Sequence, residues 1–160
     1  MFQAYHGLVF RTAYRITGNA ADAEDAMQTV FLRMMRRDRA TTGEVEKQES
    51  YFRRAAVNVS LDILRVGKNA RSVPLDDTHK ETVAERQGPD TRELRQCLRR
   101  AMALLTPREA EIFALRFFED QSNQEIARAL GMSQVHVAVI LHRTRGRLQK
   151  EIRNYLGDRI

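Results

Sequence analysis

Apolar side chains recur every three to four residues along most of this 160-residue sequence, and no segment alternates β-branched and polar residues as a strand would. In residues 2–17, for example, the pattern falls on Tyr5, Val9, Ala13 and Ile16. A chain with this single period buries its apolar side chains by packing helix against helix. The sequence therefore predicts an all-α fold.

Helix start and stop signals divide this pattern into separate helices. Gly18 ends the first helix, Asn19 caps a second that runs to about residue 37, and a third spans about residues 50–68. A fourth follows near residue 92 and stops before the capping box of Thr106 and Glu109. The expected inner faces of the second, third and fourth helices are Ala23, Met27, Val30 and Met34; Phe52, Ala56, Val59, Ile63 and Val66; and Leu94, Leu98, Ala101 and Leu105.

Composition divides the chain into two parts. Residues 71–91 contain two of the three prolines and an excess of acidic side chains, which is typical of a flexible linker. Basic side chains exceed acidic ones in residues 1–70 and 92–160, and the whole chain carries a net charge of +6. We therefore expect two small helical domains, residues 1–70 and 92–160, and an anionic partner such as nucleic acid.

Several classes of function find no support in the sequence. The single cysteine, Cys97, cannot form an intramolecular disulfide, and no set of Cys and His has the spacing of a metal site. We therefore expect no cofactor and no metal. No apolar run is long enough to cross a membrane, and no signal peptide is recognisable, so a cytoplasmic protein without membrane insertion is expected.

Residues 122–148 have the spacing of a helix-turn-helix. Ser122 and Glu125 form a second capping box, Gly131 supplies a left-handed turn residue, and Ser133 caps the last helix. The expected buried face of that helix is Val137, Leu141, Thr144 and Leu148. A plain helical hairpin is the alternative.

The side chains expected to meet duplex DNA are unusually apolar. They are Ser133, Val135, His136, Val139, His142, Arg143 and Arg145. Valines can contact thymine methyl groups but cannot make the bidentate hydrogen bonds that distinguish bases. We therefore expect modest sequence discrimination, and packing of Val135 and Val139 against a protein surface remains an alternative.

A polar stripe lies opposite the apolar face of the third helix. Its members, spaced three or four residues apart, are Tyr51, Arg54, Asn58, Asp62 and Arg65. An aromatic ring, cations and an amide on one surface suit unpaired nucleic acid, because rings and guanidinium groups stack on bases. An ordinary solvated helix face with an Asp62–Arg65 pair is the simpler alternative on these residues alone.

Two blocks of the sequence resemble a known family. "DAEDAMQTVFLRMMRR" and "YFRRAAVNVSLDILR" resemble region 2 of bacterial sigma factors of the extracytoplasmic-function (ECF) group. The segment from Leu105 to Arg145, which contains "QEIARALGMSQVHVAVILHRTR", resembles region 4 of the same family. The resemblance covers most of residues 5–150 with the blocks in the expected order.

This resemblance implies a transcription initiation factor rather than an enzyme. Its expected partners are core RNA polymerase and promoter DNA, with an anti-sigma factor as a candidate third partner, and no obligate homo-oligomer is expected. Region 2 would dock on the polymerase and melt the minus-ten element, and region 4 would bind the minus-thirty-five duplex. Asp25 and Gln28 match the docking motif, and Asn58 matches the asparagine that meets a flipped base. Leu32 and Arg36 share the outward face of the second helix with Asp25.

The sequence departs from the family pattern at three sites. Tyr51 stands where the family usually has Trp, and His136, Ala138, Val139 and Ile140 replace threonine and polar or basic residues of the recognition helix. The loop from Asp38 to Glu49 also lacks the family's aromatic and glycine pattern.

Two rival interpretations remain open. One is a stand-alone helix-turn-helix regulator with a dimerisation or sensing module in residues 1–70. The other is an enzyme that uses Asp22, Glu24 and Asp25, although side chains at neighbouring helix positions diverge by about 100°. The sigma-factor interpretation requires Tyr51, Arg54 and Asn58 to be within reach of a nucleotide.

Overall fold

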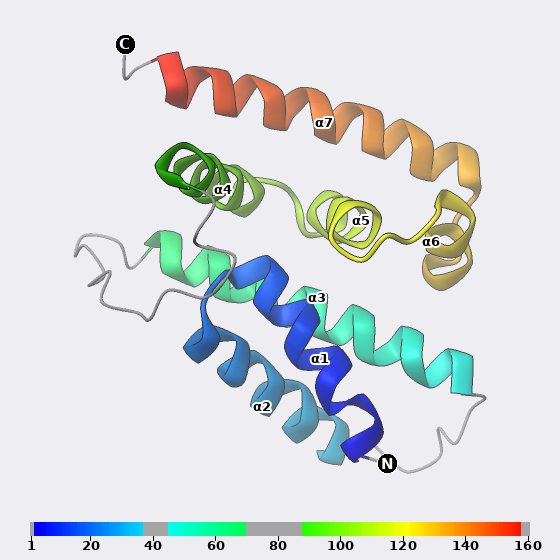
Figure 1. The fold of residues 1–160 in the computed structure, drawn as a ribbon. Coiled ribbons are helices and arrows are strands. Elements are labelled where there is room, and N and C mark those ends of the chain that lie inside the picture. The colour runs from blue at the N-terminus through cyan, green and yellow to red at the C-terminus, as the bar shows by residue number, and fades with distance from the viewer. Residues whose placement is uncertain (1, 37–44, 70–87, 158–160) are drawn as a thin grey trace.

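The computed structural model describes residues 2–36, 45–69 and 88–157, and the regular secondary structure in these ranges is helical throughout (Figure 1). The elements are α1 (Phe2–Thr17), α2 (Ala20–Arg36), α3 (Val45–Asn69), α4 (Gly88–Ala103), α5 (Pro107–Phe117), α6 (Asn123–Leu130) and α7 (Gln134–Gly157). The predicted all-α fold is confirmed. α3 begins earlier than expected, and α4 begins inside the expected linker, whose residues 71–87 lie outside the described ranges.

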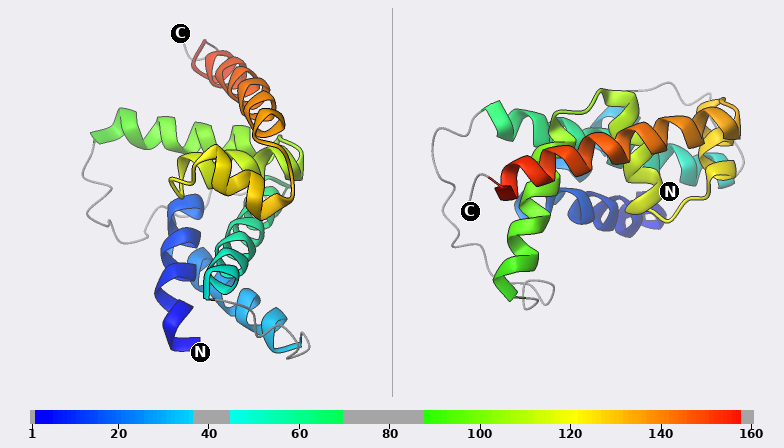
Figure 2. Two further views of the ribbon diagram at one scale, coloured as in Figure 1. Left: turned by 90° about the vertical axis from the view of Figure 1, so that its right-hand side faces the viewer. Right: turned by 90° about the horizontal axis from the view of Figure 1, so that it is seen from above.

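Helices α1–α3 form a first bundle and α4–α7 a second, and α3 lies between the two (Figures 1 and 2). The first bundle has its own apolar cluster, made by Val9, Ala13, Ala23, Ala26, Val30, Phe52, Ala56 and Val59. The core of the second bundle is built around Met102, Ile112, Leu115, Ile126 and Val137. Three side chains of the first bundle, Ile16, Val57 and Leu61, also belong to this second core. The two bundles are therefore packed together through a shared apolar contact.

α3 has two buried faces where the sequence pattern indicated one. Phe52, Ala56 and Val59 pack with α1 and α2, whereas Val57 and Leu61 pack in the core of the second bundle. Toward its end the buried side of α3 turns to the second bundle, where Leu64 packs. Val66, which was expected in the core, is consequently 66% exposed.

The start of α4 also differs from expectation. Leu94 is exposed, although it was expected on the inner face of this helix. The reason is visible in Figure 2, where the first turns of α4 project beyond the rest of the molecule, while Ala101, Met102 and Leu105 at its other end are buried.

The predicted helix caps are present. The backbone N–H of Asp22 donates to the Asn19 side chain over 3.0 Å, and both capping boxes are formed, by Thr106 with Glu109 and by Ser122 with Glu125. Gly131 ends α6 with φ 67° and ψ 38°, a left-handed conformation that glycine adopts without steric cost. These caps fix the turn between α6 and α7.

We expect Ser122→Ala to lower the free energy of unfolding by about 1 kcal/mol, the usual cost of losing an N-cap hydroxyl. Hydrogen bonds from the Ser122 backbone and hydroxyl lower the pKa of Glu125 below its ordinary value of 4.5. The stabilisation from this carboxylate is therefore present above pH 4.5 and is lost as the pH falls through the lowered pKa. Urea unfolding at neutral and acidic pH measures the difference.

The matched control is Gln124→Ala, which changes an exposed residue of the same helix that takes no part in the cap. An equal loss of stability in both variants at neutral pH would contradict the role given to the capping box.

Candidate nucleic-acid and polymerase interfaces

The polar stripe of α3 is only partly open to solvent. Asp62 is exposed and accepts a hydrogen bond of 3.0 Å from Arg65, which confirms the expected pair. Tyr51, Arg54 and Asn58 are half-buried. The expectation of a free surface opposite the apolar face of α3 is therefore wrong for this part of the stripe. α5 lies over Arg54 and Asn58, and Tyr51 packs against the apolar cluster of the first bundle.

Glu111 of α5 is the residue that covers the stripe. The Arg54 Nε donates to the Glu111 Oε2 over 2.9 Å, and Asn58 Nδ2 donates to the same oxygen over 2.8 Å. A second, longer bond of 3.4 Å joins Arg54 Nη2 to Glu111 Oε1. The Glu111 side chain is only 6% exposed, while Arg54 keeps 37% of its side chain exposed. One carboxylate therefore holds both donors that were predicted to meet a nucleotide.

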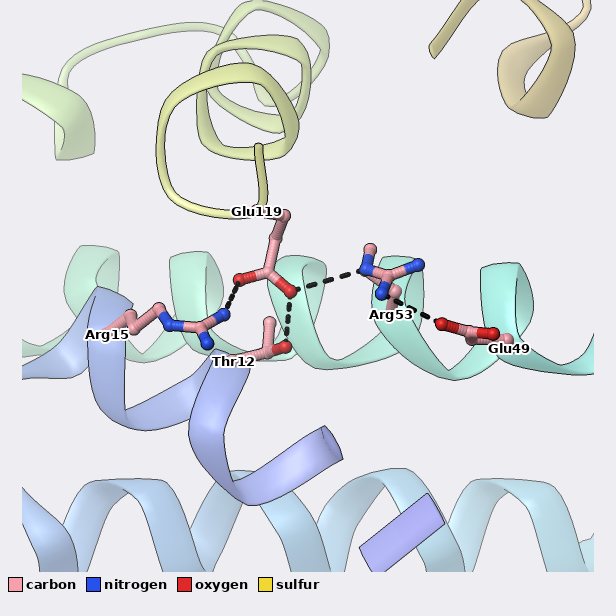
Figure 3. Close-up of polar contacts among 5 residues, drawn as sticks. All are labelled: Thr12, Arg15, Glu49, Arg53 and Glu119. Carbon is pink, nitrogen blue, oxygen red and sulfur yellow. Dashed lines mark hydrogen bonds and ion pairs between the residues drawn. The ribbon is translucent and has the colours of Figure 1, made fainter. Parts of the chain in front are cut away.

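A second acid of the same bundle, Glu119 in the turn after α5, reaches α1 and α3 (Figure 3). Its Oε1 accepts a hydrogen bond of 2.5 Å from the Thr12 hydroxyl, and its Oε2 accepts one of 2.8 Å from Arg15 Nη1. Arg53 Nε lies 3.4 Å from Oε1, and Arg53 is held in turn by Glu49. The Glu119 side chain is 1% exposed, so its charge is balanced almost entirely by groups of the first bundle.

The helix-turn-helix has the predicted inner face. Val137, Leu141, Thr144 and Leu148 are all buried. The backbone N–H of His136 donates to the Ser133 hydroxyl over 3.1 Å, which places Ser133 as the cap before α7. The opposite side of α7 therefore faces solvent. At the start of this helix, backbone N–H groups are available to bind a phosphate.

All the side chains predicted to meet duplex DNA are exposed. They are Ser133, Val135, His136, Val139, His142, Arg143 and Arg145. Val135 is 74% exposed, so this face is open and apolar at its start. The Arg145 guanidinium lies 5.7 Å from the centre of the exposed Phe117 ring, which orients it beside α5. The exposed face of α7 therefore carries valine methyl groups near the start of the helix and arginine side chains further along it.

The predicted polymerase-docking residues also share an exposed face. Asp25, Gln28, Leu32 and Arg36 are all exposed on α2, and the Leu32 side chain has 55% of its surface open. Gln28 also lines an open pocket of about 540 Å³ between α1 and α2. The pocket is bordered by His6, Gly7, Phe10, Arg11, Glu24 and Met27.

No metal-binding cluster of three or more His, Cys, Asp or Glu side chains is present within residues 2–36, 45–69 and 88–157. The acidic run of Asp22, Glu24 and Asp25 forms no such cluster. In the same ranges, no helix is both long enough and apolar enough to cross a membrane.

Sequence reasoning missed six side chains that join the bundles: Thr12, Arg15, Arg53, Arg99, Glu111 and Glu119. One signal was available for Glu111. It stands in a helix whose neighbouring positions from Ala110 to Leu115 are apolar on every side, so an acid there has to be buried and needs a partner. No comparable signal marks Glu119, which lies in a turn.

Comparison with known proteins agrees with the motifs. Residues 1–70 match the family model for sigma-70 region 2, and residues 95–148 match that for sigma-70 region 4. The chain is 30% identical over 147 residues to the RNA polymerase sigma-E factor of Streptomyces coelicolor, covering 90% of this chain and 79% of that protein. It is also 30% identical over 149 residues to the sigma-E factor of Streptomyces avermitilis, covering 90% of this chain and 78% of that one.

A third relative is named as an ECF RNA polymerase sigma factor, SigE of Mycolicibacterium smegmatis. It is 30% identical over 154 residues, which cover 93% of this chain and 57% of that protein. Because regions 2 and 4 match in order and the relatives align over most of this chain, this protein belongs to the ECF group of RNA polymerase sigma factors, which direct transcription initiation at specific promoters.

Proposed function

We propose a division of labour in which residues 1–70 dock on core RNA polymerase and melt the minus-ten element, while residues 92–160 hold the minus-thirty-five duplex. Residues 71–91 would connect the two units. The chain would supply no catalytic group, since the polymerase performs the chemistry in the cytoplasm. The observation that carries this proposal is the separate placement of three polar or cationic surfaces, on α2, α3 and α7.

The α3 surface supports a role with single-stranded DNA. Arg54 and Asn58 both direct donors at one carboxylate, so they can act together on a single acceptor. A base edge or a phosphate oxygen offers the same kind of acceptor. Tyr51 is one turn away and carries a ring for stacking, and Asp62 and Arg65 continue the surface along α3.

The α7 surface supports attachment to duplex DNA more than choice of sequence. Val135 and Val139 can contact thymine methyl groups, and His142 can hydrogen-bond to a base edge. Arg143 and Arg145 would neutralise phosphates, as would the helix start at Ser133. Binding of the isolated chain to duplex DNA should therefore be weak and should fall steeply with added salt.

In vitro initiation with core polymerase and a library of promoter sequences tests the proposed function. We expect the chain to co-purify with the polymerase and to form an open complex on a subset of the library. Failure to open any sequence, together with failure to bind the polymerase, would reject the proposal. A stable dimer that protects palindromic DNA without polymerase would instead support the stand-alone regulator.

The docking surface makes its own prediction. We expect Leu32→Asp to weaken binding to core polymerase about tenfold or more, because a buried interface leucine would be replaced by an unpaired charge. Titration of core polymerase with a fluorescently labelled chain measures this affinity.

Met35→Asp is the matched control, because Met35 is an exposed apolar residue of the same helix outside the docking set. If the two variants lose affinity equally, or Leu32→Asp binds normally, the docking residues are assigned incorrectly.

A further inference from the structure

The middle of α7 contains a glycine that the fold itself does not require. Gly146 lies inside this 24-residue helix and is exposed, and a Cβ added there would meet no side chain or neighbouring helix within 4 Å. Glycine inside a helix lowers stability relative to alanine, because its backbone loses more conformational freedom on folding. No contact within the described protein explains why this position lacks a side chain.

Other glycines of the chain have local explanations. Gly18 and Gly131 have positive φ values of 70° and 67°, which favour glycine over other residues. Gly67 lies in the last turn of α3, close to a helix end, where glycine is common. Gly146 has neither feature. An exposed glycine in this setting is typical of a place where another molecule closely approaches the backbone.

The face of α7 that contains Gly146 points away from the protein. In the view from above, α7 lies in front of the helices that it crosses (Figure 2). Glu151 is the single acidic residue of α7, and it lies about 140° around the helix axis from Gly146. The face around Gly146 therefore has a positive potential, which is complementary to the charge of phosphate.

Basic side chains flank Gly146 on this face. Arg143 lies three residues before it and Lys150 four residues after it, so both are its neighbours on the helix surface. Arg153 follows one turn beyond Lys150, and all three basic side chains are exposed. The glycine is thus a gap in a row of cations, where an anion lying over the backbone could be contacted from both sides.

The length of α7 indicates which anion this is. Val139 is about 10 Å from Gly146 and about 16 Å from Lys150 along the helix axis, at about 1.5 Å per residue. The major groove of DNA is about 12 Å wide and is bordered by the two sugar–phosphate strands. A helix that places Val139 in the groove therefore meets a bordering strand near Gly146, where a side chain would hold the helix away.

We propose that one sugar–phosphate strand of the duplex crosses α7 at Gly146, with Arg143 and Lys150 binding its phosphates from either side and Arg153 binding the next phosphate. This inference rests on the proposed binding of duplex DNA by α7. It deepens that role by adding Gly146, Lys150 and Arg153 to the contact surface. Phosphate contacts of this kind position a helix on DNA without reading its sequence.

The test measures binding of a fluorescein-labelled duplex of mixed sequence to the full chain by fluorescence anisotropy. We expect Gly146→Leu to weaken binding about tenfold or more, because the new side chain fills the space of the strand. Gly146→Ala should weaken binding less and should raise the midpoint of urea unfolding, because alanine favours the helix. Gly67→Leu is the matched control, since a Cβ there also meets nothing within 4 Å, but on α3.

Removing the two cations beyond the glycine tests the phosphate contacts directly. Each phosphate contact contributes about 0.9 to the slope of log affinity against log salt concentration, so Lys150→Ala with Arg153→Ala should reduce that slope by about 1.8. Lys47→Ala with Arg33→Ala is the control, because it removes two exposed cations of the first bundle. Gly146→Leu should have a smaller effect in the Lys150→Ala, Arg153→Ala chain than in the parent, because both changes disrupt the same contact.

Several outcomes would overturn the proposal. One is duplex binding by Gly146→Leu that is no weaker than that of Gly67→Leu, and another is an unchanged salt dependence in Lys150→Ala with Arg153→Ala. Weaker binding of Gly146→Leu to core polymerase, with normal duplex binding, would show that a protein approaches the helix there. In each case the proposed function stands if Arg143→Ala still weakens duplex binding. A parent chain that binds no duplex at low salt would reject both the role of α7 in DNA binding and this inference.

Discussion

Replacing Arg54 and Asn58 together by alanine should abolish most promoter melting while leaving polymerase binding intact. Alanine substitution at a nucleotide-stacking or base-reading position costs about 1 to 3 kcal/mol per base, so two such positions should reduce open-complex formation about tenfold or more. Both side chains lie on α3, while the docking residues lie on α2, so the polymerase contact is not touched. Permanganate reactivity of unpaired thymines reports melting, and co-purification reports docking.

The same substitutions also remove the hydrogen-bond partners of Glu111. The effect of loosening the contact between the bundles must therefore be distinguished from the effect of losing DNA contacts. Glu111→Gln weakens the contact by removing the charge while keeping Arg54 and Asn58, and it should melt promoters at least as well as the parent chain. Lys47→Ala, at an exposed position of the same helix, controls for loss of a positive charge. Normal melting by the Arg54→Ala, Asn58→Ala chain would refute the proposed role of the α3 surface.

The second large effect concerns stability. We expect Leu61→Ala to lower the free energy of unfolding by about 2 to 5 kcal/mol, the range for a fully buried leucine. Leu61 is 2% exposed and belongs to the core of the second bundle although it is part of the first. Since domains of this size are stable by only about 5 to 15 kcal/mol, the loss should be evident in urea unfolding followed by circular dichroism.

Val66→Ala is the matched control on the same helix. Val66 was expected in the core from its spacing, but it is exposed, so its truncation should change stability by no more than about 0.5 kcal/mol. A large loss of stability in Val66→Ala with a small one in Leu61→Ala would show that α3 buries the single face that the sequence pattern indicated.

The parts of the fold that depend on local chemistry could be predicted. Helix caps are fixed by residues three positions apart, which is why Asn19, Thr106 and Ser122 were identified correctly. The inner face of α7 was also predicted in full, because a helix that packs on one side leaves a single clear stripe.

The parts of the fold that depend on contacts between residues far apart in the sequence could not be predicted. α3 packs on both sides, and a helix with two buried faces gives no single stripe, so Val57 and Leu61 were overlooked. Glu111 is 57 residues away from Arg54 along the chain, and no periodicity links positions so far apart. For the same reason the exposed residues of α2 and α7 were placed correctly, whereas the half-buried ones of α3 were not.

The apolar part of the shared contact has a consequence for how the protein behaves in solution. Ile16, Val57 and Leu61 would meet water if the bundles came apart, as would the apolar side chains of the second bundle that pack on them. A chain whose bundles had separated without a partner would therefore expose apolar surface to other molecules and would be prone to aggregate. Packing of the two bundles against each other would keep these side chains covered, and the protein monomeric, until the polymerase binds.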